Sequence, residues 1–551
     1  MMTKKKHYQL PLERLKILVR EHGDEVWLHQ PTSRVWAQYT FNEVYDSALR
    51  IASGLKAQGI NSGDRVAILA KNSAYWMIAD FACMLGGFIS VPIYATAGED
   101  TISYVMEHSD SKAIFVGKLD DGTAADAVLN ATNVIALPDY NLESRVPDHH
   151  WHDWLLRCEP LTDIHQAAAD DTLTIAYTSG STGKPKGVVL SHINLAAAGH
   201  DTADLLGEGD SERRVLSYLP MAHITERSIV TMHSLYKRLT IYFNEDLASF
   251  VEDLNIAKPS FFMTVPRLWA KFQSQVLSVI PDEQLQEMLK GEGGEAVAAG
   301  IRAKLGLSEC SAFGSGTAPI PPGLLKWFRG IGIDIGEGWG MTETSGPACS
   351  NLPYHAERIG SIGVPLPCTD MKISDEGEIL IRGTAIFKEY YKNPEATAET
   401  FIDDWMHTGD KGIQNDDGSF SIIGRVKEQF KTGKGKYVAP VPIECLIGAV
   451  PLIEQVCVVG SGRGQPMALA VLADLGNINK DDVRNIISSA VAELNAGLES
   501  HCRIDHIHIC DEAWTIENNM LTPTMKLKRD ILEAKYRHII EGETKELVGW
   551  S

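Results

Sequence analysis

The stretch Ala176–His192 reads AYTSGSTGKPKGVVLSH and packs Thr, Ser and Gly into a run that ends in Lys-Pro-Lys-Gly. The β-branched and aromatic residues of DTLTIAYT before the run, and the apolar residues of GVVLS after it, are typical of two strands. Gly180 and Gly183 allow the chain between them backbone conformations that other residues resist. The sequence therefore predicts a loop that joins two strands, not a loop that opens a helix.

The same loop has the chemistry of a phosphate site. Its hydroxyls, its N–H groups and Lys184 or Lys186 are suited to surround a polyphosphate. A Walker A loop needs four residues between its first glycine and a Gly-Lys pair, whereas two residues separate Gly180 from Gly183, and Pro185 follows Lys184. We expect a mobile flap over a polyphosphate; the alternative is a flexible turn without a ligand. The residues predicted to bind are Thr178, Ser179, Gly180, Ser181, Thr182, Gly183 and Lys184.

Outside this loop, helical periodicity alternates with short apolar segments. FNEVYDSALRIASGLKAQGI precedes DRVAILA, and FISVPIY and KAIFVG follow, which predicts strands covered by helices. Residues 377–420 have short strands with frequent Gly and Asp turns, and the chain becomes Lys-rich after Gly424. We predict an α/β protein with two domains, residues 1–424 and 425–551. The larger should hold several subdomains with mixed sheets covered by helices and a small barrel-like region; the smaller should be a mobile α/β domain.

Composition argues against several other classes. The 551 residues exceed the size at which one core stops growing. A formal net charge of −21 opposes a broad nucleic-acid surface, so no nucleic-acid partner is expected. The 9 cysteines form no CxxC pair, which favours a reduced, cytoplasmic protein over a zinc or disulfide framework. The N-terminus, MMTKKKHYQLPLERL, lacks the apolar region of a secretory signal.

One segment is apolar enough to suggest a membrane span. Residues 75–95 read YWMIADFACMLGGFISVPIYA, but they include Asp80, two adjacent glycines and Pro92. These residues favour a buried helix that leads into a strand.

Further motifs follow the loop in a fixed order, and together they resemble the adenylate-forming superfamily of acyl-CoA synthetases, luciferases and peptide-synthetase adenylation domains. The first is GWGMTET (338–344), preceded by GSGTAP (314–319). By resemblance these segments form the adenine pocket: Trp339, where Tyr is common, stacks on the base, Thr342 contacts the α-phosphate, and Glu343 with Thr178 holds Mg²⁺. The nucleotide-binding residues implied here are Gly316, Thr317, Glu337, Gly338, Trp339, Gly340 and Thr342.

Two motifs resemble the family's ribose-binding segments. WMHTGDKG (405–412) carries Asp410, expected to bind both ribose hydroxyls, although such an Asp in isolation is more often a turn cap. GRVKEQFK (424–431) carries Arg425, which by resemblance also reaches the ribose. Lys427 matches the hinge of the C-terminal domain, and Lys431 matches a lysine that contacts the nucleotide. In isolation this charge run would be a solvated basic strand end.

The last motif, LTPTMKLKR (521–529), resembles the one whose lysine bridges the substrate carboxylate and the α-phosphate. Lys526 matches that lysine, although pattern alone does not distinguish it from Lys528 and Arg529. A cation between two anions lowers the barrier as charge moves toward pyrophosphate. The resemblance implies ATP, Mg²⁺ and coenzyme A: an acyl-adenylate forms, the C-terminal domain turns at Lys427, and coenzyme A displaces AMP near Gly435.

LPMAHITER (219–227) and VPRLWAKF (265–272) look most like the long-chain acyl-CoA synthetases. His223 matches the position beside the reacting carboxylate; without the resemblance, a packed core histidine is the better interpretation. The predicted function is a long-chain fatty acid CoA ligase, with Lys526, His223, Thr342 and Glu343 as catalytic residues. Three alternatives stay open: a ligase that passes the acyl group to a carrier-protein thiol, a CoA ligase for a medium-chain or aryl acid, and a binding protein that has lost the chemistry.

Location and assembly are less constrained by the sequence. The basic N-terminal TKKK and a membrane-dissolved substrate suggest peripheral contact of a cytoplasmic enzyme with the inner membrane surface, although no lipidation signal accompanies them. Monomer and homodimer both stay open.

Overall fold

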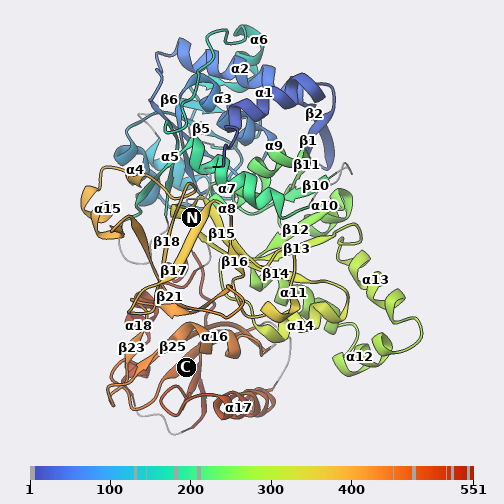
Figure 1. Ribbon diagram of the computed structural model, residues 1–551, viewed down its shortest axis with the longest axis vertical. Helices are drawn as coiled ribbons and strands as arrows, with labels where there is room; N and C mark the ends of the chain where they lie inside the picture. The colour runs from blue at the N-terminus through green and yellow to red at the C-terminus, as the bar shows by residue number, and fades with distance from the viewer. Residues whose placement is uncertain are drawn as a thin grey trace.

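The computed structural model describes residues 6–129, 133–143, 145–178, 184–207, 213–450, 452–473, 479–516, 518–522, 526–542 and 546–550. Over these residues the strands form six hydrogen-bonded sheets. Helices and sheets of the first three quarters of the chain build the larger body in Figure 1, and the C-terminal residues form a smaller body below it. The mixed α/β class predicted from the sequence is confirmed.

The largest sheet carries the predicted strand–loop–strand unit. It has eight strands in the order β19 (Glu389–Tyr390), β9 (Gly187–Ser191), β8 (Thr172–Tyr177), β4 (Ile89–Ile93), β3 (Arg65–Leu69), β5 (Ser111–Val116), β6 (Asn133–Ala136) and β7 (His149–His150). β8 and β9 pair antiparallel, with Tyr177 opposite Gly187, so the predicted pair of strands is confirmed. Residues 179–183 of the loop, which include the predicted binding residues Ser179, Gly180, Ser181, Thr182 and Gly183, lie outside the described residues.

The apolar segment around residue 80 is a buried helix. Ser73 caps α3 (Ala74–Gly86) by accepting the N–H of Trp76, and every residue of the helix except the half-buried Tyr75 is buried. The helix ends at Gly87, whose φ of 77° is readily adopted by glycine, and the chain continues into β4. The prediction of a core helix leading into a strand is confirmed. Among the residues that the structure describes, none of the helices is both long and apolar enough to span a bilayer.

Two further sheets belong to the larger body, and the first of them contributes to the lining of the cavity described below. One is β12 (Phe261–Thr264), β13 (Ala312–Ser315), β14 (Ile335–Met341), β15 (Gly346–Ser350) and β16 (Val364–Pro365); its first three strands are parallel and the others antiparallel. The other is β10 (Arg213–Ser217), β11 (Leu239–Phe243), β1 (Val26–Thr32) and β2 (Val35–Thr40).

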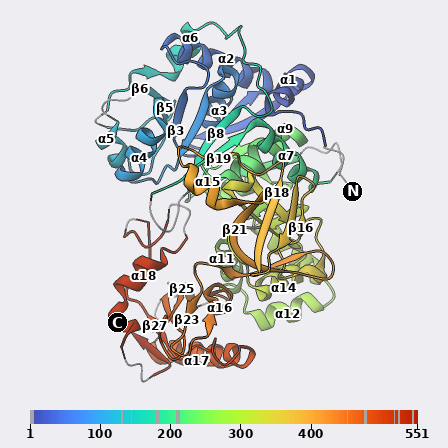
Figure 2. The same ribbon diagram turned by 60° about the vertical axis from the view of Figure 1, so that its left-hand side comes forward.

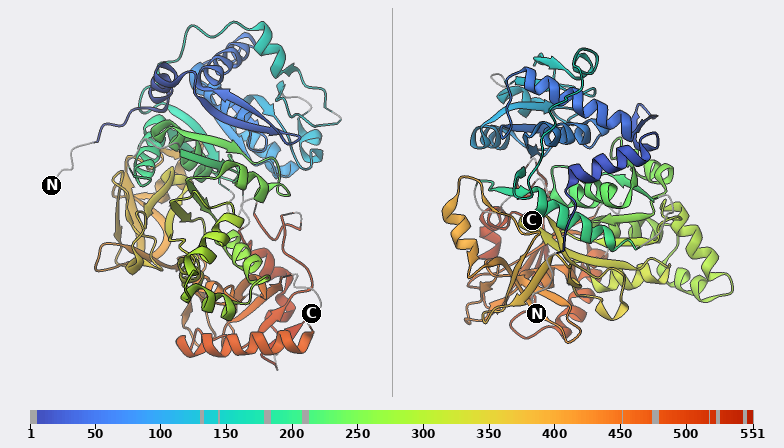
Figure 3. Two further views of the ribbon diagram at one scale, coloured as in Figure 1. Left: turned by 90° about the vertical axis from the view of Figure 1, so that its right-hand side faces the viewer. Right: turned by 45° about the horizontal axis from the view of Figure 1, so that its top comes forward.

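Helices cover these sheets, and Figure 3 shows α12 and α13 standing away from the body (yellow-green). The other helices of the larger body, together with these two, are α1 (Pro11–His22), α2 (Phe41–Ala57), α4 (Glu99–Ser109), α5 (Thr123–Val128), α6 (Trp151–Arg157), α7 (His192–Asp204), α8 (Ile224–Glu226), the π-helix η1 (Arg227–Met232), α9 (His233–Lys237), α10 (Phe250–Ala257), α11 (Pro266–Leu277), α12 (Asp282–Lys290), α13 (Gly294–Lys304), α14 (Pro322–Gly330) and the 3₁₀ turns η2 (Thr342–Thr344) and η3 (Ala356–Arg358).

The expected barrel-like region is an open sheet. β17 (Thr369–Ile373), β18 (Glu378–Gly383), β21 (Trp405–Gln414) and β20 (Phe401–Ile402) follow one another, and β22 (Phe420–Arg425) also pairs with β21. α15 (Pro394–Thr400) precedes β20. Within the described part of the chain no pairing joins the outer strand β17 to β20 or β22. Closing a sheet into a barrel would require the two outer strands to hydrogen-bond to each other. The prediction of a barrel-like region is therefore wrong.

After Arg425 the described strands pair only with one another. A hairpin of β23 (Phe430–Lys431) and β24 (Tyr437–Val438) is followed by a sheet of β25 (Ile453–Val459), β26 (Met467–Leu472), β27 (Ile507–Ile509) and β28 (Val548–Trp550). The helices here are α16 (Pro440–Ile447), α17 (Lys480–Gly497), α18 (Arg529–Lys535) and α19 (Arg537–Ile540). In Figure 2 the red segment before α18 rises from this body toward the larger one.

Candidate active site

The GWGMTET segment begins in β14, which pairs antiparallel with β15, and ends in the 3₁₀ turn η2. Gly340 faces the β14–β15 pairing so closely that a Cβ added there would lie 2.0 Å from the carbonyl oxygen of Gly346. Because any side chain would collide with backbone, the hairpin itself requires glycine at this position. The tight hairpin leads into η2, which places Thr342 and Glu343 directly after the strand.

Asp410 joins two of the predicted motifs. Its side chain is buried, and Trp339 Nε1 donates a hydrogen bond to its Oδ2 at 2.9 Å. Arg425, opposite Asp410 in the β21–β22 pairing, places Nε 2.7 Å from Oδ1. Burial raises the pKa of Asp410, and the Arg425 guanidinium opposes that rise. The aromatic, acidic and basic residues assigned to the nucleotide therefore form one contiguous cluster.

Lys526 reaches this cluster from the C-terminal body. Its ammonium lies within electrostatic range of Asp410, Glu343 and Arg425. The side chain remains accessible to solvent, but protein surrounds it on several sides. The surrounding protein partly desolvates the ammonium, and the Arg425 charge repels it, so both lower the pKa of Lys526. The carboxylates of Asp410 and Glu343 oppose this shift. Its backbone is fixed locally, because the Thr522 N–H donates to the Lys526 carbonyl at 2.8 Å.

His223 faces the same lysine from the larger body. Its Nδ1 accepts the backbone N–H of Thr225 at 3.2 Å, at the start of α8. A neutral imidazole that accepts at Nδ1 carries its proton on Nε2. Burial, with a smaller contribution from the Lys526 charge, lowers the pKa of His223 to about 4. The ring is thus a neutral Nε2–H donor at physiological pH.

Glu343 is a buried carboxylate with one oxygen already engaged. Tyr390 donates its hydroxyl to Oε1 at 2.7 Å, and the Glu343 carbonyl accepts the N–H of Phe387 at 2.8 Å. Burial and the Glu343 charge raise the pKa of Tyr390, so the phenol stays a donor. No hydrogen bond within the described ranges engages Oε2. A carboxylate with one oxygen held and one available suits a hard cation such as Mg²⁺.

The GSGTAP segment lies beside the β14 glycines. A Cβ at Gly316 would lie 3.2 Å from the Gly338 carbonyl oxygen and 2.8 Å from Met263 Cε, so the backbone after β13 runs close to β14. Thr317 has a φ of 68°, an uncommon backbone conformation for a β-branched residue and one that concentrates at functional sites. Glu337 is buried and accepts the Gly360 N–H at 3.0 Å; burial raises its pKa to about 7.

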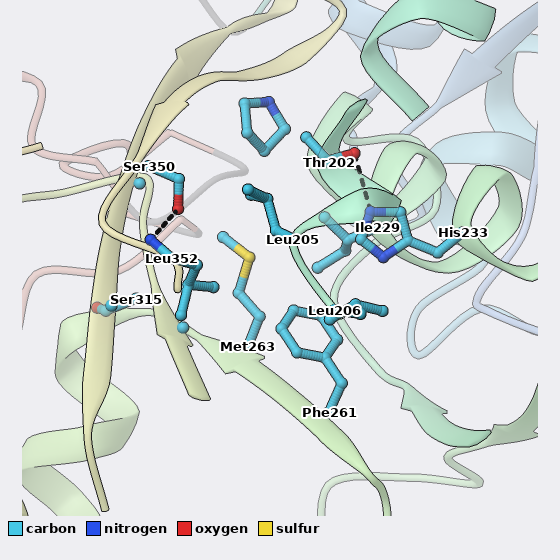
Figure 4. A pocket seen from close by; sticks show the side chains of 14 residues that line it. Thr202, Leu205, Leu206, Ile229, His233, Phe261, Met263, Ser315, Ser350 and Leu352 are labelled. Carbon is cyan, nitrogen blue, oxygen red and sulfur yellow. Dashed lines mark hydrogen bonds between the residues drawn. The ribbon is translucent and has the colours of Figure 1, made fainter. Parts of the chain in front are cut away.

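An apolar cavity opens beside these strands. Figure 4 shows its lining from β12, β13 and β15 on one side and from α7 and η1 on the other. The lining residues are Thr202, Leu205, Leu206, Ile229, His233, Phe261, Met263, Gly314, Ser315, Gly336, Gly338, Pro347, Ser350 and Leu352. Because Gly338 belongs both to this lining and to the GWGMTET segment, the cavity adjoins the polar cluster.

Other predicted residues lie apart from the cluster. Lys427 is exposed in the turn after β22. Lys431 places Nζ 4.8 Å from the ring centre of Tyr437, and Gly435, with a φ of 75°, is in the β23–β24 turn. At the start of the phosphate loop the Thr178 N–H donates to the Lys186 carbonyl at 2.9 Å, and Lys184 lies over the Tyr104 ring.

Several residues that support the site were not predicted from the sequence. Tyr390 holds Glu343 from 47 positions away, and Glu428 adds its charge to those near Lys526. Glu226 is buried and accepts the Ser217 hydroxyl at 2.8 Å and the Tyr218 N–H at 3.0 Å, which anchors the segment before His223. Burial raises the pKa of Glu226 to about 8. The Glu-Arg pair of LPMAHITER was the available signal, since Ser217 and Tyr218 lie only 9 and 8 positions before Glu226.

Comparison with known proteins places most of the chain within known family models. The AMP-binding enzyme family matches residues 17–391, and the AMP-binding enzyme C-terminal domain matches residues 428–545. The chain is 31% identical to the long-chain-fatty-acid–CoA ligase FadD15 of Mycobacterium bovis, over 95% of each chain. It is 30% identical to the peroxisomal long chain acyl-CoA synthetase 7 of Arabidopsis thaliana, over 92% of this chain and 82% of that one.

Solved structures share the fold. The A domain of carboxylic acid reductase from Segniliparus rugosus, in complex with AMP and a carboxylic acid, superposes with a TM-score of 0.80 at 23% identity, over 98% of this chain and 94% of that one. The family match spans well over half of the residues, and the resemblance seen in the motifs is confirmed: the chain belongs to the AMP-binding enzyme family.

Proposed function

We propose that the protein converts a long-chain fatty acid and ATP to an acyl-adenylate and pyrophosphate, and then transfers the acyl group to coenzyme A. The observation that carries this proposal is the position of Lys526, which brings a cation from the C-terminal body to Asp410, Glu343 and Arg425, and to His223. The names of relatives such as the Mycobacterium bovis long-chain-fatty-acid–CoA ligase support the substrate class and the thiol acceptor.

The nucleotide would be held by the motifs that meet at Asp410. Trp339 offers a stacking face for the adenine, Asp410 and Arg425 offer an acceptor and a donor for the ribose, and Thr342 offers a hydroxyl to the α-phosphate. Residues 178–184, with Lys184, would surround the outer phosphates, and Gly316, Thr317, Glu337, Gly338 and Gly340 would shape the base pocket.

Glu343 and Thr178 fit a magnesium ion, because both supply hard oxygen donors and the Tyr390 hydroxyl leaves one Glu343 oxygen available. Bound Mg²⁺ would neutralise charge on the phosphates. The chain's own contribution is to fix the carboxylate that faces this ion.

In the first reaction the substrate carboxylate oxygen bonds to the α-phosphorus, and the bond from that phosphorus to pyrophosphate breaks. The Lys526 ammonium would lie between the two anions, where it stabilises the charge that develops in the transition state. His223 would donate Nε2–H to the carboxylate and orient it. In the second reaction we propose that residues 425–551 turn at Lys427, which withdraws Lys526 and brings Gly435 and Lys431 to the site for coenzyme A.

The test measures pyrophosphate release with Mg·ATP and acids from acetate to oleate, with and without coenzyme A. Release that peaks with long chains, depends on coenzyme A and is lost in Lys526→Ala would support the proposal; Lys528→Ala is the matched control, because its Nζ bonds Asn519. Release independent of coenzyme A would instead favour a carrier-protein acceptor, and no release with any acid would contradict the proposal. Vesicle flotation and sedimentation would separately test peripheral membrane contact and a monomer against a homodimer.

A further inference from the structure

Two polar side chains in the lining of the apolar cavity, those of Thr202 and His233, are hydrogen-bonded to each other. His233 Nε2 lies 2.9 Å from Thr202 Oγ1, and both side chains are almost fully buried. The His233 ring packs against Phe261 in β12. Met263 follows two residues later in this strand, and Gly316 and Gly338 lie beyond it, toward the polar cluster. Figure 4 shows the His233 imidazole projecting into the cavity from one side, with Ser315 and Ser350 on the other.

The hydrogen bonds of Thr202 fix the tautomer of this histidine. Thr202 Oγ1 donates to the carbonyl of Ala198 at 2.6 Å, one turn earlier in α7. A hydroxyl has one hydrogen, so Thr202 must accept from His233, which places the imidazole proton on Nε2. Nδ1 therefore presents a lone pair. Burial, with a smaller contribution from Lys237, lowers the pKa of His233 to about 3, and the ring is neutral.

The acceptor at Nδ1 has no donor among the residues that the structure describes. Ile229, Leu206 and Phe261, which share the lining with His233 and are drawn on its side of the cavity in Figure 4, have apolar side chains without a donor. An unpaired acceptor buried in an apolar cavity is unfavourable, and in native proteins such a group usually finds a partner in a ligand or an ordered water. A straight alkyl chain in this cavity would leave Nδ1 unpaired, whereas a chain with a hydroxyl at the right depth would not.

We propose that the cavity is built for a fatty acid that carries a hydroxyl group partway along its chain, and that His233 Nδ1 accepts the hydrogen bond of that hydroxyl. The inference rests on the proposed function, because it refines the acid that this function activates. His233 is a specificity residue and takes no part in the chemistry at the carboxylate. A hydroxyl near the carboxylate would lie at the Gly338 end instead, so the preferred position is internal.

The experiment compares kcat/KM for acids of one chain length, unsubstituted or with a single hydroxyl at successive positions. We expect one internal position at which the hydroxy acid is preferred over its neighbours by about two- to tenfold, the size of one net hydrogen bond. His233→Leu should abolish that preference while continuing to activate the unsubstituted acid. Thr202→Val, similar in shape, removes the group that fixes the tautomer and should weaken the preference without removing the imidazole.

A matched control separates polarity from cavity shape. Ile229→Val alters the same end of the cavity without a polar change, so it should leave the ratio between hydroxy and unsubstituted acids as in the wild type. The inference is overturned if no internal position is preferred, or if His233→Leu retains the wild-type ratio while turning over unsubstituted acids. A protein that activates no acid at all would contradict the proposed function instead, so the two failures are distinguishable.

Discussion

Trp339 donates its indole N–H to Asp410 across 71 positions of the chain, at 2.9 Å. The aromatic residue expected to stack on the adenine and the carboxylate expected to bind the ribose are therefore one hydrogen-bonded unit. Since Asp410 is buried, each of its oxygens depends on a protein partner, Trp339 for one and Arg425 for the other. A change at Trp339 should consequently affect the ribose contact even when an aromatic face is kept.

Trp339→Phe tests this coupling. Phenylalanine keeps a stacking surface but removes the donor to Asp410, and a hydrogen bond to a charged group contributes about 1.5–3 kcal/mol. We expect the KM for ATP to rise by about tenfold or more, with a smaller effect on the KM for the acid, measured by pyrophosphate release. Trp327→Phe is the control, because it breaks a similar bond to Asp282 in another part of the molecule. Equal effects of the two substitutions on ATP would refute the coupling.

Tyr390→Phe should leave the Glu343 carboxylate less firmly oriented and so weaken the binding of Mg²⁺. The substitution removes the 2.7 Å hydrogen bond to Oε1 and preserves the ring. Partners that orient a metal-binding carboxylate typically contribute 10- to 100-fold to metal affinity. We expect the Mg²⁺ concentration for half-maximal activity to rise by about tenfold, and Tyr391→Phe, one residue away, to leave it unchanged. An unaltered Mg²⁺ dependence in Tyr390→Phe would argue that Glu343 does not hold the ion.

Glu337 should make the stability of the protein depend on pH. Burial raises its pKa from 4.5 to about 7, so between these values the folded protein binds a proton that the unfolded chain releases. Its contribution to stability is complete below the unfolded pKa and declines as pH rises toward 7. Above that pH the charged carboxylate costs roughly 3 kcal/mol relative to the unfolded state.

Glu337→Gln removes this titration. Melting temperatures measured from pH 5 to pH 8 should show the variant gaining stability relative to the wild type as pH rises, because the wild type alone acquires the buried charge. The exposed Glu376→Gln serves as the control and should follow the wild type. A constant difference between Glu337→Gln and the wild type over this range would show that Glu337 does not titrate there.

The sequence predicted those parts of the molecule that depend on local residue patterns. The β8–β9 pair and the α3–β4 unit follow from runs of β-branched, aromatic and apolar residues, and both are present. The open sheet of β17, β18, β20, β21 and β22 is not distinguished from a barrel by the sequence, because short strands with polar turns look alike whether or not their outer edges meet. Lys526 was chosen over Lys528 and Arg529 by resemblance alone; in the structure Lys528 bonds Asn519 and Arg529 bonds Glu444.

Contacts between distant segments could not be predicted from one sequence. His233 and Thr202 are an ordinary histidine and threonine in apolar surroundings, and only the packing of α7 against α9 turns them into a polar pair within a cavity. Asp80 was noticed as a charge in an apolar segment, but nothing in that segment indicates its partner. The partner is Arg227, 147 positions later, and the pair is fully buried.

Asp80 and Arg227 join α3 to the start of η1. Arg227 Nη2 lies 2.8 and 2.7 Å from the two Asp80 oxygens, and Nη1 donates to Thr174 Oγ1 at 2.8 Å. Removing one member of a buried ion pair leaves an uncompensated charge, which typically costs about 3–5 kcal/mol. We expect Asp80→Ala to lose about this much free energy of unfolding in urea, followed by tryptophan fluorescence.

The double variant Asp80→Leu with Arg227→Met distinguishes the cost of an unpaired charge from the value of the pair. Replacing both charges by apolar side chains removes the desolvation cost of each, so such exchanges are often neutral or stabilising. We expect the double variant to recover most of the stability lost in Asp80→Ala. If the double variant were as unstable as Asp80→Ala, the ion pair itself would be essential to the packing of α3 against η1. His223 and Ile229, which flank Arg227 in the sequence, should then lose their positions as well.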